Sequence, residues 1–136
     1  MNWYTPLAVM AFCIFFWNTA FAHDPDCPEC DAWYASLMQP DNPTVSCCGE
    51  ADAYWCDPIH VREEEKQGVR VKITSCTIND PREDAPLHNR VHVPIGTVID
   101  IPDYKLKWDK GNPTGHAIVF LSRMQYVYCF VQDGGV

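Results

Sequence analysis

Residues 46–56 have the sequence SCCGEADAYWC and hold three of the eight cysteines of this 136-residue chain. A disulfide between adjacent cysteines strains the peptide that joins them, so we expect Cys47 and Cys48 to bond two different partners. Ser46 is placed to cap a short helix that runs through Trp55 and ends before Pro58. The segment is therefore predicted to staple a helical part of the chain to the strands that follow it.

The N-terminus predicts export. The first 22 residues contain no Asp, Glu, Lys or Arg, and an apolar run is followed by an Ala20-Phe21-Ala22 cleavage site. This pattern is typical of a secretory signal peptide. We expect residues 1–22 to be removed and residues 23–136 to form a single globular domain in the periplasm or outside the cell, with an uncleaved N-terminal anchor as the alternative.

Cysteine usage agrees with that address, because the cysteines of exported chains usually form disulfides. The odd number after the cleavage site leaves one thiol free or bonded to another molecule. We expect Cys30, on the core face of a helix, and Cys129, in a buried strand, to lie near the Cys47-Cys48 pair. The seven cysteines are Cys27, Cys30, Cys47, Cys48, Cys56, Cys76 and Cys129.

The net charge of −8 belongs entirely to residues 23–57, which hold eight acids and no Lys or Arg. This charge argues against nucleic acid or an anionic membrane as a partner after cleavage of the signal peptide. A cation or a basic partner would suit it, and so would a solvated surface that keeps the protein soluble.

A helix that precedes residues 46–56 and a series of strands that follow them are also predicted. Asp26 and Glu29 form a capping box, and the spacing of the next apolar residues places them on one helical face. These residues are Cys30, Trp33, Tyr34 and Leu37. Further strands are expected at residues 91–93, 97–101 and 104–108. In the last of these, Lys105 and Lys107 should point to solvent. Residues 117–121 and 126–131 should form a buried hairpin.

Residues 59–74 alternate between apolar and polar, which predicts a hairpin with one solvated face. If Ile59 and Val61 share the core face with Val71 and Ile73, the numbers of paired residues add to an even total, and the loop is residues 65–67 or 66–68. Both registers place two cysteines on the same side of the hairpin. A disulfide between Cys56 and Cys76 is therefore predicted.

The predicted fold class is α+β, with short N-terminal helices packed on an antiparallel sheet that can curl into a small barrel. Several segments resemble a set of small exported bacterial proteins of unknown function. They are SCCGEADAY at 46–54, KLKWDKGNPTGH at 105–116 and VYC at 127–129, together with Trp33 to Leu37. The resemblance implies a shared fold and a periplasmic address, and it brings no catalytic residues.

Two motifs suggest chemistry. Cys27-Pro28-Glu29-Cys30 has the spacing of thiol-disulfide oxidoreductases, although it opens the predicted mature chain among acidic residues, which raise rather than lower a thiol pKa. Cleavage after Ala22 would expose His23, whose amine and imidazole could hold copper as in a histidine brace. Candidates for a second copper ligand are His60, His88, His92 and His116, of which His60 and His92 are expected on solvent faces.

No motif specifies a catalytic reaction. We therefore expect a disulfide-stabilised, non-enzymatic binding or structural module whose partner is an unidentified protein or small molecule. A copper-binding protein centred on His23 is the alternative, and a redox protein using Cys27 and Cys30 is the lesser one.

Overall fold

The structure, a computed structural model, describes residues 27–82, 90–107 and 111–132. The predicted signal peptide, His23 and His88 therefore lie outside the described residues. In chain order the elements are α1 (Cys30–Ser36), β1 (Met38–Gln39), β2 (Asn42–Ser46), β3 (Asp52–Lys66), β4 (Val69–Ile78), β5 (Val98–Ile101), the 3-10 helix η2 (Asp103–Lys105), β6 (Leu106–Lys107), β7 (Ile118–Leu121) and β8 (Val127–Val131).

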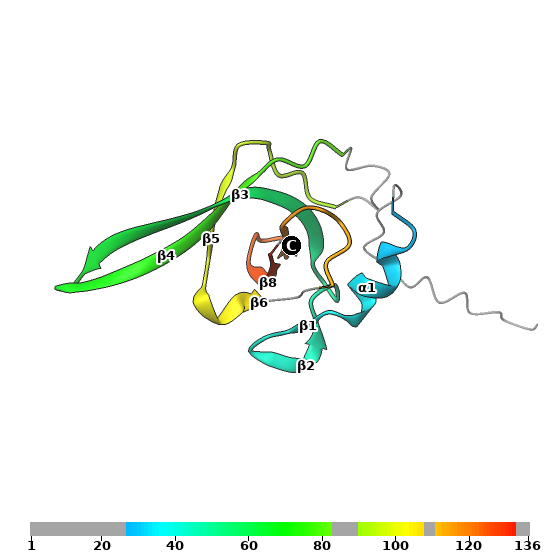
Figure 1. Cartoon of the computed structure of the whole chain (residues 1–136), viewed down its shortest axis with the longest axis horizontal. Helices are drawn as coiled ribbons and strands as arrows, with labels where there is room; N and C mark the ends of the chain where they lie inside the picture. Colours follow the sequence, from blue (N-terminus) through cyan, green and yellow to red (C-terminus); the bar gives the residue numbers. More distant parts are fainter. Residues whose placement is uncertain (1–26, 83–89, 108–110, 133–136) are drawn as a thin grey trace, which may run out of the picture.

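A six-stranded sheet in the order β5-β4-β3-β7-β8-β6 forms the body, and β1 and β2 form a separate pair (Figure 1). All neighbouring strands are antiparallel except β6 and β8, which are parallel. Among the described residues no ladder joins the edge strands β5 and β6, so the predicted closure into a barrel is wrong. In this part of the chain no helix is long and apolar enough to cross a membrane.

The buried C-terminal hairpin is confirmed, because β7 and β8 pair and bury both of their faces. On one face Val119, Leu121 and Phe130 pack with residues of β3, β4 and β5. On the other face Ile118 and Phe120 pack against α1. The two faces of the hairpin thus belong to two separate cores. Each fully buried apolar side chain in them stabilises the fold by about 1.5–3 kcal/mol.

Helix α1 presents the predicted face to the second core. Cys30, Tyr34 and Leu37 are buried, and Trp33 packs at the margin. The ring of Tyr34 meets that of Phe120 edge-on at a centroid distance of 6.1 Å, a favoured aromatic geometry. The predicted helix is thus present, starting at Cys30.

The second predicted helix, from Ser46 to Trp55, is absent, so the helical part of the fold prediction is only partly right. Ser46 ends β2, and residues 52–55 begin β3 and pair with β7. The Ser46 hydroxyl donates to the carbonyl of Leu37 and accepts from the amide of Cys48, which makes a local turn of the kind that competes with a helix. Pairing with β7 then outweighs the local propensity.

The β3–β4 hairpin has a different register from the predicted one. Lys66 faces Val69 and Glu64 faces Val71, so paired numbers add to an odd total. The turn is the two-residue pair Gln67-Gly68, with φ of 53° and 76°, and positive values at both positions match the twist that two-residue hairpins need. A register of this parity places Ile59 and Val61 on the opposite face from Val71 and Ile73.

Two smaller expectations also fail. Residues 91–93 are not a strand. Lys105 is not turned to solvent: it lies in η2 with 9% of its surface exposed, and its Nζ donates to Gln39 Oε1 at 3.0 Å and to Asp41 Oδ1 at 2.7 Å. A buried ammonium is stable only when paired in this way, and the pattern of alternation in the sequence could not show these partners.

Candidate functional site

Three disulfides occur in the described part of the chain: Cys27–Cys30, Cys47–Cys129 and Cys56–Cys76. The Cys56–Cys76 bond is present as expected from the sequence, and Cys129 bonds to one of the adjacent cysteines. Cys30 lies in the same core as that pair but bonds to Cys27. The expectation that Cys48 would also find a partner is wrong, because its thiol is free.

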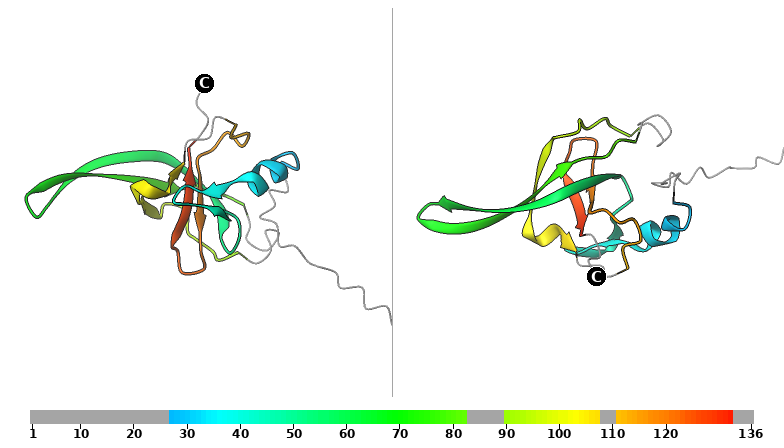
Figure 2. Two further views of the ribbon diagram at one scale, coloured as in Figure 1. Left: turned by 90° about the horizontal axis from the view of Figure 1, so that it is seen from below. Right: turned by 45° about the horizontal axis from the view of Figure 1, so that its top comes forward.

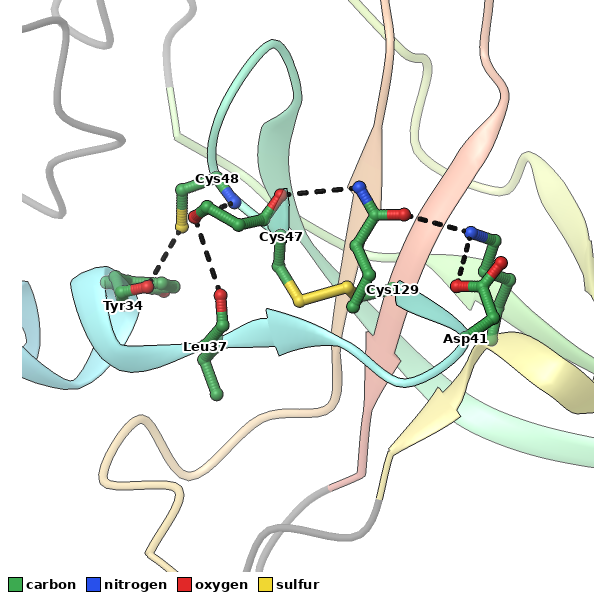
Figure 3. The surroundings of a disulfide bond; sticks show 9 residues. Tyr34, Leu37, Asp41, Cys47, Cys48 and Cys129 are labelled. Carbon is green, nitrogen blue, oxygen red and sulfur yellow. Dashed lines mark hydrogen bonds and ion pairs between the residues drawn. A yellow bond between two sulfur atoms is a disulfide. The ribbon is translucent and has the colours of Figure 1, made fainter. Parts of the chain in front are cut away.

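Figure 3 shows how Cys48 is held beside the Cys47–Cys129 bond. Its Sγ donates to the carbonyl of Tyr34 at 3.2 Å, and its amide donates to Ser46 Oγ. Burial raises the pKa of this thiol to about 12. A thiol that stays protonated is a poor nucleophile, which argues against a reactive role for Cys48 or its pairing with a second molecule.

The Cys27–Cys30 disulfide opens α1. Cys30 is fully buried, whereas Cys27 is partly exposed. The neighbouring Glu29 is exposed and Asp31 is half-exposed, so negative charge surrounds the motif. This setting does not favour a thiolate, and the geometry adds nothing that separates a redox role from a structural one.

Three histidines lie in the described residues, namely His60, His92 and His116. His60 and His92 are exposed, as expected, while His116 stacks on Trp55 at a ring-centroid distance of 3.9 Å, and its Nδ1 lies 2.9 Å from Asp57 Oδ2. Asp57 Oδ1 also accepts from the amide of Ala117, so this cluster ties the start of β7 to β3. Within the described ranges no group of three or more His, Cys, Asp or Glu side chains could hold a metal ion.

A buried ion cluster lies beside Trp55. Asp80 Oδ2 accepts from Arg82 at 2.6 Å and from Arg90 at 3.0 Å, and all three side chains are at most 9% exposed. Burial raises the pKa of Asp80, but the hydrogen bonds from the two arginines outweigh it and bring the pKa down to about 2. The guanidinium of Arg82 also lies over the Trp55 ring, 4.7 Å from its centroid. Arg90 also donates to the carbonyls of Ala53 and Arg82, so this cluster joins β3 to the segment that follows β4.

The surface feature that stands out is the far half of the β3–β4 hairpin, residues 62–73, which we call the arm. Figures 1 and 2 show it extending away from the body of the protein. Strand β7 pairs only with residues 52–55 of β3, and β5 pairs only with residues 74–77 of β4. In the described structure both edges of the arm are therefore without a partner strand.

Charged side chains organise the arm at its base. The guanidinium of Arg62 binds both carboxylate oxygens of Asp100 in β5, at 2.9 and 2.8 Å, and its Nε donates to Glu64 at 2.8 Å. These hydrogen bonds lower the pKa of Asp100 and of Glu64. The bidentate pair crosses β4 and so connects three strands where the arm leaves the body.

The arm was not singled out by sequence reasoning. The pattern did predict a hairpin here. What it could not show is that Val61 and Val69 are 63% and 61% exposed, or that β5 and β7 stop short of the tip.

Comparison of the chain with family models, curated proteins and solved structures found no match. The resemblance to small exported bacterial proteins therefore stays a prediction.

Proposed function

We propose that this chain is an exported, disulfide-stapled, non-enzymatic binding module that contacts a protein partner through the arm. The observation that carries the proposal is a long hairpin that projects from the body of the protein and whose two edges pair with no further strand in the described residues. The body supplies two packed cores and three disulfides, as stable exported domains commonly do.

The arm gains little stability from burial of its own side chains. Ordering each residue of a strand costs about 1–2 kcal/mol of conformational entropy, which burial of apolar surface normally offsets. In residues 62–73 most side chains are exposed, and none is buried. A two-stranded hairpin is only marginally stable in water without a third strand beside it or a helix packed on it. A partner that covers the arm would supply the missing contacts.

The arm's attachment also suits a contact role. The Cys56–Cys76 disulfide and the Arg62–Asp100 pair both lie where the hairpin leaves the sheet. Restraining the base limits the orientations of the tip, and such preorganisation reduces the entropy lost on binding.

Photo-cross-linking tests the proposal. A benzophenone amino acid is placed at the exposed position of Glu65 in the arm, or at exposed Arg123 in the β7–β8 turn as the control, and the protein is expressed in its native host. We expect one adduct of defined mass from position 65 and none from position 123. Equal adducts from both positions, or none from the arm, would refute an arm-mediated contact.

A matched deletion then tests whether the arm contributes affinity. Removing residues 63–64 and 71–72 deletes two pairs of facing residues from the ladder. The Gln67-Gly68 turn is kept, and every other side chain stays on the same face of the hairpin. Because a few central residues dominate most interfaces, we expect the shortened chain to bind the cross-linked partner at least about tenfold more weakly. Unchanged affinity with an intact fold would place the contact elsewhere.

A further inference from the structure

The free edge of β4 has a chemistry that identifies the kind of segment it can bind. Resting on the proposed binding function, we propose that an extended segment of another protein, with acidic residues alternating with apolar ones, adds as a new strand beside residues 69–73. Such strand addition uses main-chain hydrogen bonds for affinity and alternate side chains for specificity.

The backbone groups needed for strand addition can be located. Ile78 exchanges hydrogen bonds with the segment before β5: its amide donates to Thr97 and its carbonyl accepts from Gly96, each at 2.8 Å. In an antiparallel ladder every second residue points the same way, so the amide and carbonyl groups of Arg70 and Lys72 also face that edge. In the described residues β5 covers the edge only as far as Thr74.

The edge is uncovered because β5 ends early. Ile101 faces Thr74, and Pro102 and η2 then carry the chain away from β4. A proline at this point cannot donate a ladder hydrogen bond. An incoming strand would lie where a longer β5 would have continued, bounded by Ile101 at one end and open towards the arm tip.

The two faces of this edge differ in character. Arg70 and Lys72 project from one face and are exposed, with Glu65 and Glu63 of β3 directly opposite them on the same face. Val69, Val71 and Ile73 of β4 project from the other face, opposite Lys66, Glu64 and Arg62 of β3, and Val69 is 61% exposed. Directly opposed cross-strand side chains interact, and an incoming strand would oppose β4 and not β3, so it needs acidic residues beside Arg70 and Lys72 and apolar residues beside Val69 and Val71. These requirements give an alternating pattern with a period of two.

Peptide titration tests the inference with a defined probe. The probe is a capped, fluorescein-labelled heptapeptide in which valine alternates with glutamate, and the control replaces every glutamate with lysine. Binding to the full exported protein is followed by fluorescence anisotropy. We expect saturable binding of the glutamate peptide and about tenfold weaker binding of the lysine peptide, since like charges across a ladder repel.

Two variants separate backbone pairing from charge. Lys72→Pro removes an amide that points to the free edge, where proline is tolerated, and should abolish binding; Lys72→Gln keeps the amide and should weaken binding about threefold. The double variant R70E/K72E should reverse the preference and bind the lysine peptide, a gain that an unfolded protein could not show.

Binding that is equal for the two peptides, or unchanged by Lys72→Pro, would overturn strand addition at this edge, as would no binding at about 1 mM peptide. If the arm still cross-links to a partner in those cases, only the chemistry inferred for the segment fails. If position 65 gives no adduct either, the proposed binding function fails with it.

Discussion

Cys56 lies opposite Ile78 across the β3–β4 ladder, yet its sulfur is bonded to that of Cys76. Between the Cys56 and Ile59 rungs, β3 contains two residues, Asp57 and Pro58, where β4 contains one. This β-bulge brings Cys56 onto the same face as Ile59 and within reach of Cys76, with a Cα–Cα distance of 5.3 Å. The staple at the base of the arm thus depends on an irregularity in the strand.

Removing the Cys56–Cys76 disulfide should destabilise the fold by an amount set by the number of residues in the loop that it closes. The bond spans 20 positions, so in the chain-entropy model the variant C56S/C76S should lose about 3 kcal/mol of unfolding free energy. The matched variant C27S/C30S, which opens a much shorter loop, should lose about 2 kcal/mol. Urea unfolding measures both. A greater loss in C27S/C30S would contradict this ordering.

The free thiol should resist alkylation in the folded protein. With its pKa raised to about 12 by burial, Cys48 at pH 8 is ionised in roughly one molecule in ten thousand. We expect iodoacetamide to leave Cys48 unmodified under native conditions and to label it rapidly in urea, as read by peptide mass. Fast labelling of native protein would show that the thiol is accessible as a thiolate.

The parts of the fold that the sequence predicted are those with strong local patterns. Helical spacing identified the buried face of α1 at Tyr34 and Leu37, and the unbroken apolar runs identified β7 and β8. The side of the sheet to which each side chain of β3 points was predicted wrongly, because a bulge reverses the alternation of side chains along a strand. Pro58 was the available signal, since proline within a strand is usually confined to an edge or a bulge.

The candidate site was harder to predict, because it is defined by where neighbouring strands end. Arg70 and Lys72 have the ordinary alternation of a solvated strand. Only the pairing shows that β5 stops at Ile101 and that no described strand pairs with the outer edge of these two residues. Lys105 illustrates the same limit, since its partner Asp41 is distant in sequence and determines its burial.

Acid should destabilise the protein partly through Asp80. Its pKa is about 2 in the folded state against an unperturbed 3.8, so its ionised form stabilises the fold above pH 4, and this contribution is lost as the pH falls through 2. In Asp80→Asn both arginines lose their carboxylate, which should cost about 3–5 kcal/mol at pH 6. The loss should be smaller at pH 2.5.

Urea unfolding of wild type and variant at the two pH values measures this difference. Asp103→Asn serves as the control, because Asp103 is exposed and no ion pair is found for it among the described residues. An equal loss at both pH values for Asp80→Asn would mean that the ionised carboxylate is not the source of the stabilisation.

The ion pairs of Arg62 should control the carboxylates around it and the order of the arm. Arg62→Gln removes the hydrogen bonds that lower the pKa of Asp100 and of Glu64, so both should titrate at higher pH in carboxyl-detected NMR. Without the bidentate pair, amide protons of residues 62–73 should exchange faster, while those of β7 and β8 keep their protection. Arg123→Gln, at an exposed turn position, is the control. Unshifted titration of Asp100, or unchanged exchange in the arm, would show that this pair does not restrain the base of the arm.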